Sequence, residues 1–251
     1  MSRTLYQLSY SPWSEKARWA LDHHGMKYTS VEHLPLLGEP FLRLRTGRLT
    51  GRISVPFLVD DELRMADSFE IARHADLRGG GSSLFPEADF EAIKRWNETS
   101  EGMLAAGRAL ATARAMADSE ARREALPANI PNSMRGWLTP MADLGAAFLT
   151  RKYGYGDWSV EACTQRLADG LADLDRATDS GRGTVLESGF CYADIAMAVA
   201  LQFVAPVDEA YIHLGPASRR CWSQPALAER FAAVVAWRDR TYSERRRPQP
   251  V

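Results

Sequence analysis

The stretch SYSPWSEKARWAL, residues 9–21, decides the fold, because it joins a strand-like run to a helix through a tight turn. The run TLYQL at 4–8 precedes it and is typical of a strand. Gly25 follows it and marks the expected end of the helix. One face of that helix is formed by residues with helical spacing: Trp13, Ala17, Ala20, Leu21 and His24.

Strand and helix signals continue as far as Leu77. KYTSVEHL at 27–34 is typical of a second strand, and EPFLRLRTG at 39–47 of a short helix or an irregular stretch. VPFLVDDELRMAD at 55–67 predicts a β-hairpin around an Asp-Asp-Glu turn, and DSFEIARHADL at 67–77 predicts a helix. The first part of the chain therefore has the order β-α-β-α-β-β-α, which is complete as a small domain.

The chain changes character at RGGGSSLFPEAD, residues 78–89, a Gly-, Ser- and Pro-containing stretch that is typical of a linker. After it the periodicity is helical, and only GTVLE at 183–187 is a possible strand. We therefore predict an α/β domain followed by an all-helical one. The predicted boundaries are 1–78 for the first domain, 79–89 for the linker, 90–245 for the second domain and 246–251 for a tail. Helices are expected from residue 90 onward and near 160–178, 191–205 and 225–243.

The composition excludes several classes of protein. The chain of 251 residues has 45% hydrophobic and 25% charged residues, which is ordinary for a soluble globular protein. Its net charge of −1 argues against a nucleic-acid binder. Its one basic cluster, RRR at 245–247, is interpreted as a frayed, solvated tail. Neither a secretory signal nor an apolar run long enough to cross a membrane is visible.

The cysteines and histidines form no metal-binding pattern and no disulfide framework in the sequence. The pair His23–His24 stands at a predicted helix end, which favours an interaction with the helix dipole over a pair of metal ligands. A reducing cytoplasm is therefore the predicted location, and no metal is expected. The cysteines are odd in number and widely spaced: Cys163, Cys191 and Cys221.

The turn Ser11-Pro12-Trp13-Ser14 has two interpretations. The first turn of a helix offers unpaired N–H groups and a partial positive charge, so an anion is stabilised there and a serine hydroxyl adds a donor. If the anion is a thiolate, the pKa of its thiol falls, and the thiolate is the reactive form. Alternatively, Ser11 or Ser14 simply caps the helix, with Pro12 in its first turn. Taken alone, the turn favours the cap.

Two further elements also have two interpretations each. A cis peptide at Val55–Pro56 would direct the Val55 backbone outward toward an extended peptide, but trans is the commoner state of such bonds and is favoured by the residues alone. Asp67 and Glu70 have the spacing of a capping box. The same place could hold the head group of an amino acid, with Ser68 and the helix N-terminus on its carboxylate and Asp67 on its ammonium.

The order and spacing of these elements are more specific than any one of them. A strand, Ser-Pro-x-Ser, a helix, Val-Pro, a hairpin, Asp-Ser and a Gly-rich linker into helices together resemble the soluble (cytosolic-type) glutathione S-transferase family, as a serine-type bacterial-like member. The resemblance spans most of the chain, is strongest at 4–27, 53–77 and 186–200, and is weak through 115–160. Its marks are SPWSEKARWAL, SVPFLVDDELRMADSFEIARHAD, LFPEAD and SGFCYADIAMA.

The resemblance implies a thioredoxin-like N-terminal domain that binds glutathione and an all-helical C-terminal domain that carries the second-substrate site. Ser11 stands where serine- or cysteine-type members carry the residue that activates the glutathione thiol. Ser14 is a second catalytic candidate, and Tyr6 and Tyr10 are more remote ones. A cysteine would favour thiol exchange, whereas a serine can only donate a hydrogen bond to the thiolate, which favours conjugation.

The rest of the glutathione site follows from the same resemblance. Family members carry a cis-proline at the position of Pro56, so we expect a cis bond there and pairing of the Val55 backbone with the cysteinyl unit. Asp67 and Ser68 would take the γ-glutamyl end, Asp67 as a shortened version of the Glu that members often carry. Arg52 is a weaker candidate for the glycyl carboxylate, since a solvated surface role is commoner for arginine.

Two regions depart from the family pattern. In FCYADIAMA, Cys191 stands where members place Ser or Thr, so we expect Asp194 to cap the helix by reaching backward and Cys191 to be a buried structural thiol. The Pro-broken stretch 118–160, with RGWLTPM and RKYGYGDW, is either an extra helical layer or a wall of the second-substrate pocket. Weaker candidates for lining the cleft lie on the first long helix: Trp96, Met103 and Arg108.

The predicted function is conjugation of glutathione to a small hydrophobic electrophile, a detoxification reaction, carried out by a cytoplasmic homodimer. The alternatives are a glutathione-dependent dehalogenase or isomerase, and a non-catalytic glutathione-transferase-like binding or regulatory protein. A thiol reductase or peroxidase is disfavoured because no cysteine stands near residue 11. Nucleic acid and membrane are not expected as partners.

Overall fold

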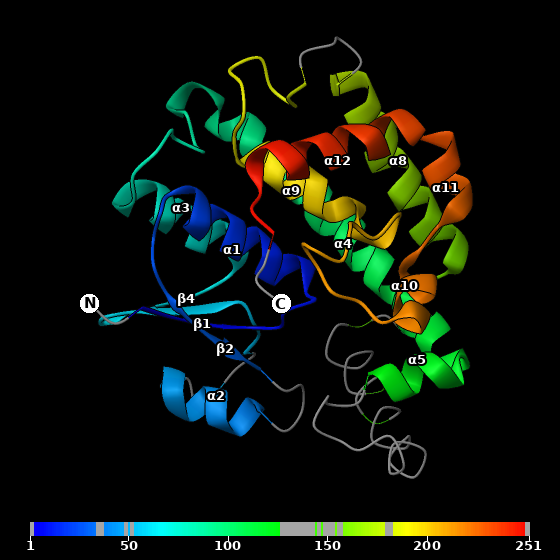
Figure 1. Cartoon of the computed structure of the whole chain (residues 1–251), viewed down its shortest axis with the longest axis horizontal. Helices are drawn as coiled ribbons and strands as arrows, with labels where there is room; N and C mark the ends of the chain where they lie inside the picture. The colour runs from blue at the N-terminus through cyan, green and yellow to red at the C-terminus, as the bar shows by residue number, and fades with distance from the viewer. Residues whose placement is uncertain are drawn as a thin grey trace.

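The structure, a computed structural model, has a four-stranded sheet with its helices at one end and a bundle of helices at the other (Figure 1). Among the residues that it describes, no helix is both long enough and apolar enough to span a membrane. The described residues are 3–33, 38–47, 50, 53–125, 144, 147, 154, 158–178 and 183–248.

The sheet is built from the strands that the sequence predicted. Strands β1 (Arg3–Gln7), β2 (Thr29–Glu32), β3 (Phe57–Asp60) and β4 (Leu63–Ala66) lie in the order β2-β1-β3-β4. β1 is parallel to β2 and antiparallel to β3, and β3 is antiparallel to β4. The β3–β4 hairpin turns at Asp61, whose φ of 52° is in the left-handed region that Asp tolerates better than most residues.

Three helices cover the two faces of this sheet. α1 (Pro12–His23) and α3 (Ser68–Arg78) pack against each other on one face, and α2 (Glu39–Thr46) lies on the other (Figure 1). Gly25 follows α1 with a φ of 64°, a conformation that glycine adopts without strain. The predicted order β-α-β-α-β-β-α is confirmed.

The apolar side chains of the sheet fill both of its faces, because successive residues of a strand point to opposite sides. Leu5 of β1 points toward α1 and α3, and its neighbour Tyr6 points toward α2. The first of these two small cores contains Leu5, Ala17, Leu21, Met26, Leu58, Ile71 and Ala75. The second contains Tyr6, Leu42, Ile53 and Phe57.

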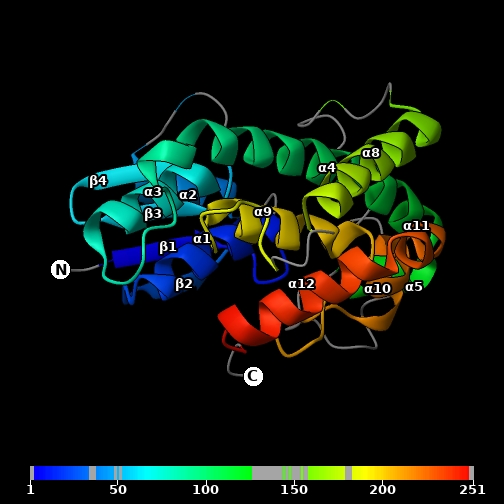
Figure 2. The same cartoon turned by 90° about the horizontal axis from the view of Figure 1, so that it is seen from above.

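The described elements that follow residue 86 are all helical, as predicted. α9 is buried along its whole length and lies between α4 and α12 (Figure 2). α9 also packs against α1, so the large helical core continues into the first part of the chain through Trp19, Ala20 and Ala72. The α-helices are α4 (Phe90–Ala117), α5 (Ser119–Glu124), α8 (Val160–Thr178), α9 (Tyr192–Ala200), α10 (Pro216–Trp222), α11 (Pro225–Arg230) and α12 (Ala232–Arg245).

Three details of the helical part differ from the sequence prediction. The possible strand at 183–187 is wrong: this stretch is a series of bends, and the Val185 N–H donates to Asp194 instead of to a neighbouring strand. α10 was not predicted. The single helix expected at 225–243 is two helices, α11 and α12, which meet at Phe231. Most of the stretch 118–160, including RGWLTPM, lies outside the described residues.

The interpretation of residues 245–247 as a frayed, solvated tail is wrong for Arg246. Its side chain is only 3% exposed, and its Nε donates to Glu15 Oε1 at 2.7 Å. The reason lies in α1, where the carboxylate of Glu15 is fully buried and must be compensated by a cation. The chain therefore remains anchored to the protein at least as far as Arg246.

Candidate functional site

Ser11 occupies the N-cap position of α1, with Pro12 in the first helical turn. Its backbone is extended (φ −73°, ψ 126°), and its carbonyl accepts the first helical hydrogen bond, from Glu15 N–H at 2.9 Å. The Ser11 side chain makes no capping hydrogen bond, although capping is the usual use of a serine at this position. Its hydroxyl is therefore placed at the positive end of α1 without a role in closing the helix.

Ser14 differs from Ser11 in both burial and bonding. It is fully buried, and its Oγ accepts the backbone N–H of Leu8 at 3.2 Å. This bond ties the first turn of α1 back to the turn between β1 and α1. Ser14 therefore serves the local structure, and Ser11, at 7% exposure, is the more accessible of the two hydroxyls.

The sheet brings Pro56 and Asp67 to the end of its strands that lies near Ser11. Tyr6 of β1 pairs with Phe57 of β3, and Phe57 pairs with Ala66 of β4. Pro56, just before β3, and Asp67, just after β4, therefore lie at the end of the sheet where β1 leads into the turn before α1. The Val55–Pro56 peptide is cis, as the family resemblance predicted.

Asp67 is the N-cap of α3 and has an unusual backbone. Its φ of 88° is rare for a residue with a side chain, and such conformations concentrate at functional sites. Its Oδ1 accepts the N–H groups of Phe69 at 2.8 Å and Glu70 at 3.4 Å. Asp67 is thus a true helix cap, while its other carboxylate oxygen makes none of the hydrogen bonds observed among the described residues.

Ser68 begins α3 and is 2% exposed. Its hydroxyl lies beside that of Tyr192 at the start of α9, but the two do not reach normal hydrogen-bond geometry, and neither has another partner within the described part of the chain. Burial raises the pKa of Tyr192 well above its ordinary value, and the nearby Ser68 hydroxyl opposes that rise. A buried, unpaired hydroxyl at a helix N-terminus suits a carboxylate ligand.

Sequence reasoning missed a polar cluster that joins α1 to α4. Lys16 is fully buried and donates to Glu101 Oε1 at 2.5 Å, and the indole N–H of Trp13 donates to Glu101 Oε2 at 2.7 Å. The guanidinium of Arg108 lies 4.2 Å from the centre of the Trp13 ring. Burial alone would raise the pKa of Glu101, but Lys16, Trp13 and Arg108 together outweigh it, so this pKa is lowered and the carboxylate stays ionised. A charged residue on the buried face of α1 was the only sequence signal for this contact.

The remaining candidates are placed as follows. Arg52 lies outside the described residues. Tyr6 is 9% exposed and belongs to the core under α2, whereas Tyr10 is 38% exposed and contacts Trp222 edge to face. Met103 is fully buried in the helical core, so its expected place in the cleft is wrong.

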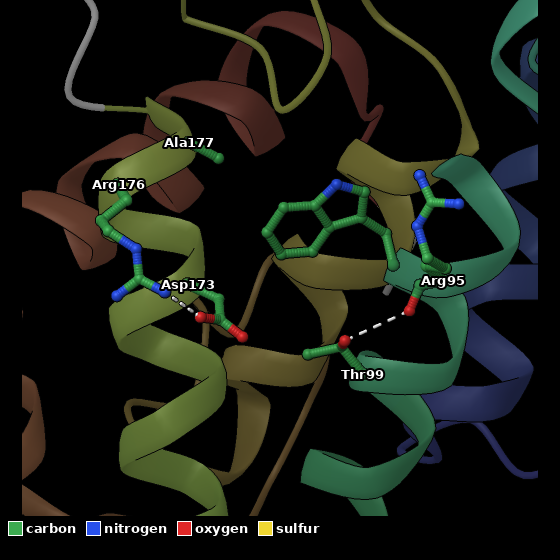
Figure 3. Close-up of a pocket in the computed structure, with 6 residues that line it drawn as sticks. Arg95, Thr99, Asp173, Arg176 and Ala177 are labelled. Atoms are coloured by element: carbon green, nitrogen blue, oxygen red, sulfur yellow. Dashed lines mark hydrogen bonds and ion pairs between the residues drawn. The ribbon is translucent and has the colours of Figure 1, made fainter. Parts of the chain in front are cut away.

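A separate cavity of about 460 Å³ lies between α4 and α8, and contains none of the predicted catalytic or glutathione-binding residues (Figure 3). Trp96, a weaker candidate for the cleft, lines this cavity. On its α8 side, Arg176 and Asp173 form an ion pair (Figure 3). The full lining is Arg95, Trp96, Thr99, Asp173, Arg176 and Ala177.

The start of α9 confirms the prediction made for Cys191 and Asp194. Asp194 Oδ2 accepts the N–H of Cys191 at 2.9 Å, and Oδ1 accepts the N–H of Val185 at 2.7 Å. Burial and the neighbouring Asp194 raise the pKa of the Cys191 thiol to about 12. Cys191 is therefore a protonated, buried thiol and not a nucleophile.

The sequence of this chain was compared with protein families and with curated proteins. Residues 10–78 match the family model described as "Glutathione S-transferase, N-terminal domain". This match confirms the resemblance to the glutathione S-transferases for the N-terminal part of the chain. No curated protein matches the chain by sequence.

Solved glutathione transferases share the whole fold at low sequence identity. One from Methylobacillus flagellatus with glutathione bound has 17% identity and a TM-score of 0.61, and the match covers 97% of this chain and 96% of that chain. One from Methylobacterium radiotolerans in complex with glutathione sulfonate has 16% identity and a TM-score of 0.62, covering 100% and 97%. One from Phanerochaete chrysosporium has 17% identity and a TM-score of 0.64, covering 99% and 100%.

These likenesses settle the fold class. The first part of the chain is a thioredoxin-like, glutathione-transferase-type N-terminal domain with a small mixed sheet, and the remainder is largely helical. The fold class predicted from the sequence is confirmed.

Proposed function

We propose that the protein is a glutathione transferase that conjugates glutathione to a small hydrophobic electrophile. The observation that carries this proposal is the Ser11 hydroxyl at the N-terminus of α1, which is not used to cap the helix. In this position it can donate a hydrogen bond to a sulfur bound at the helix end. The proposal assigns thiolate stabilisation to Ser11 and a structural role to Ser14.

The energy needed for this task is modest. Lowering the pKa of a thiol by one unit takes about 1.4 kcal/mol of preferential stabilisation of the thiolate. A hydrogen bond to a charged group is worth about 1.5–3 kcal/mol, and the helix dipole adds roughly 0.3–1 kcal/mol. One serine at this helix end is therefore sufficient to make the thiolate a substantial species near neutral pH.

The glutathione would lie at the end of the sheet where Val55, Pro56, Asp67 and Ser68 are found. The Val55 backbone would pair with the cysteinyl unit, the free oxygen of Asp67 would meet the γ-glutamyl ammonium, and Ser68 with the start of α3 would meet the γ-glutamyl carboxylate. The relatives solved with glutathione or glutathione sulfonate bound support this placement through their shared fold. Arg52 stays a candidate for the glycyl end.

The wider organisation is part of the same proposal. We assign residues 1–78 to the glutathione domain, 79–89 to the linker and 90–245 to the domain with the second-substrate site. A cytoplasmic homodimer with a detoxifying role remains our expectation.

The direct test is retention on glutathione-agarose, followed by an assay with 1-chloro-2,4-dinitrobenzene. We expect the protein to be retained, to be eluted by free glutathione, and to form the conjugate faster than the uncatalysed reaction. Retention without conjugation of this and other electrophiles would favour the non-catalytic binding protein. Absence of retention and of conjugation would refute the proposal.

A further inference from the structure

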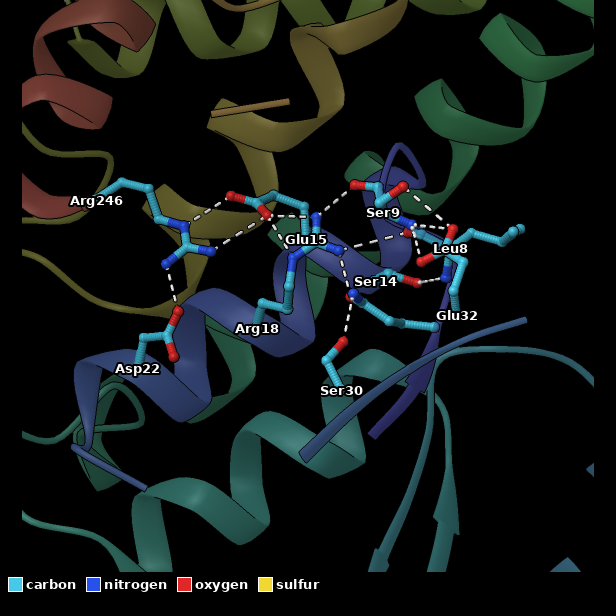
Figure 4. Close-up of polar contacts among 10 residues, drawn as sticks. Leu8, Ser9, Ser14, Glu15, Arg18, Asp22, Ser30, Glu32 and Arg246 are labelled. Atoms are coloured by element: carbon cyan, nitrogen blue, oxygen red, sulfur yellow. Dashed lines mark hydrogen bonds and ion pairs between the residues drawn. The ribbon is translucent and has the colours of Figure 1, made fainter. Parts of the chain in front are cut away.

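We propose that Arg246, acting through Glu15 and Arg18, positions the turn that carries Ser11, so that the C-terminal end of the chain sets the geometry of the thiol site. This inference rests on the proposed function for its catalytic consequence. Figure 4 shows the connected polar contacts from Arg246, across α1, to the turn and to β2. The three residues are positioning residues, since none of them is placed against the reacting sulfur.

The first part of the connection is a buried ionic cluster on one face of α1. Glu15 is fully buried and bonds two guanidinium groups: Arg18 Nη2 at 2.7 Å and Arg246 Nε at 2.7 Å. Arg246 Nη1 also reaches Asp22 Oδ2 at 2.5 Å. Asp22 is 40% exposed, so the buried part of the cluster is the Glu15 carboxylate between two guanidiniums, with Asp22 as a second carboxylate at its solvent-facing side.

The second part of the connection runs from Arg18 to the turn before α1. Arg18 Nη2 donates to the carbonyl of Ser9 at 2.8 Å, and Nη1 donates to the carbonyl of Leu8 at 3.4 Å. Nη1 also bonds Gln7 Oε1, and Gln7 Nε2 donates to Ser30 Oγ of β2 at 2.7 Å. One guanidinium thus holds the end of β1 and the first two residues of the turn.

The rest of the turn depends on the residues that Arg18 fixes. The N–H of Ser11 donates to the carbonyl of Leu8 at 3.0 Å, and the N–H of Leu8 donates to Ser14 Oγ at 3.2 Å. The N–H of Ser9 donates to Glu32 Oε1 at 2.9 Å. The carbonyl of Leu8 accepts hydrogen bonds from both Arg18 and the Ser11 amide. A shift of Arg18 is therefore transmitted to the backbone of Ser11.

Arg246 affects the position of Arg18 because both guanidiniums bind the carboxylate of Glu15. With Arg246 present, each oxygen of the Glu15 carboxylate accepts a hydrogen bond from a guanidinium. Without Arg246, Glu15 and Asp22 each lose a guanidinium contact, while the contact of Arg18 with Glu15 stays. Glu15 and Arg18 then have room to rearrange, and the turn loses part of its support.

The test compares Arg246→Met with Arg247→Met, because Arg247 is the exposed neighbour of Arg246. The pKa of the glutathione thiol in the complex is read from the ultraviolet absorbance of the thiolate as a function of pH. We expect Arg246→Met to raise this pKa by about 0.5 unit or more over the control, and to lower conjugation at about pH 6.5 roughly threefold. The affinity for glutathione should change less than about twofold, since a merely unstable protein would lose both together.

A second readout does not depend on glutathione. Hydrogen exchange of the amides in residues 8–11 should accelerate about tenfold or more in Arg246→Met relative to Arg247→Met. If circular dichroism shows that Arg246→Met does not fold, Arg246→Lys replaces it, because lysine keeps the charge but lacks the planar, two-pronged guanidinium. The changes in thiol pKa and in amide exchange should then have the same direction and be smaller.

The outcomes separate the two proposals. A wild-type protein that binds no glutathione or shows no thiolate overturns the proposed function, and the exchange comparison then decides the positioning role alone. A folded Arg246 variant whose turn exchanges as slowly as the control, and whose bound thiol has the pKa of the control, overturns the inference.

Discussion

The first turns of α1 and α9 each bury a carboxylate completely, yet they use it in opposite ways. Asp194 of α9 accepts two backbone N–H groups and closes the start of its own helix. Glu15 of α1 pairs instead with the guanidiniums of Arg18 and Arg246. The start of α9 is thus closed by its own side chain, whereas at the start of α1 the buried carboxylate pairs with cations and the Ser11 hydroxyl makes no capping bond.

The electrostatics follow the same division. Burial raises the pKa of Asp194 to about 6, although the N–H groups of Cys191 and Val185 oppose the rise. Burial also acts to raise the pKa of Glu15, but Arg246 and Arg18 outweigh it, so that pKa is lowered. We infer that the closed start of α9 serves stability, whereas the start of α1, where Ser11 does not cap the helix, is the one that we propose takes a ligand.

The largest expected effect is on stability at the closed start. Asp194→Ala leaves the N–H groups of Cys191 and Val185 without partners inside the core, which should cost about 2–4 kcal/mol of unfolding free energy. Asp194→Asn keeps one acceptor and should lose less. Urea denaturation measures both, and a loss below about 1 kcal/mol for the alanine variant would remove the basis of the comparison.

The pH dependence of stability should be opposite for the two carboxylates. The folded pKa of Asp194 lies above its unfolded value near 3.9, so its contribution to stability should fall as pH rises from about 4 to about 6, by at most about 2–3 kcal/mol. The folded pKa of Glu15 is lowered, so its contribution is present above its unfolded pKa near 4.3 and is lost as pH falls through the lowered value.

Urea midpoints of the wild type and Asp194→Asn, measured from pH 3 to pH 7, separate these contributions. The wild type should lose stability relative to the variant between about pH 4 and pH 6, and both should lose stability in stronger acid. If the urea midpoints of the two proteins change in parallel between about pH 4 and pH 6, Asp194 does not titrate in that range.

At the open start the expected effect is on activity. Ser11→Ala should reduce the conjugation rate at neutral pH about tenfold, which corresponds to about 1.4 kcal/mol, and should change stability by less than about 0.5 kcal/mol. Ser14→Ala should have a different main effect: it leaves the Leu8 N–H unpaired, so it should cost about 1–3 kcal/mol of stability. Full activity in Ser11→Ala would mean that another group activates the thiol.

The smallest expected effect is the absence of a reaction at Cys191. With a pKa of about 12 and no exposure, its thiol should not react with a disulfide reagent at about pH 8 while the protein is folded. Peptide mapping after alkylation identifies the modified residue, and the guanidinium-unfolded protein should react at Cys163, Cys191 and Cys221. Rapid labelling of Cys191 in the folded protein would show that the start of α9 opens readily.

The sequence predicted those parts of the fold that depend on local patterns. The turn at residues 9–14, the hairpin around Asp61 and the end of α1 at Gly25 all have short-range signals, and the structure contains each of them. The backward reach of Asp194 could be predicted because its partner, Cys191, is three residues away. Such features are fixed by backbone geometry and by the chemistry of neighbouring residues.

The sequence did not predict contacts between residues far apart in the chain. Arg246 and Glu15 are separated by 231 positions, and an arginine among other arginines near the end of the chain resembles any solvated tail. Lys16 and Glu101 are similarly remote, at 85 positions. A charged residue is placed in the core only by its partner, and a single sequence does not identify that partner. The same limit applies to the proposed second-substrate pocket, which would be made from scattered helix positions.

The central claim is that a glutathione sulfur binds at the N-terminus of α1 and accepts a hydrogen bond from Ser11. A crystal structure of the protein with glutathione tests it most directly. We predict the sulfur within hydrogen-bonding distance of Ser11 Oγ, with the γ-glutamyl group at Asp67 and Ser68. A sulfur bound elsewhere, or a Ser11 hydroxyl turned away from an occupied site, would contradict the claim.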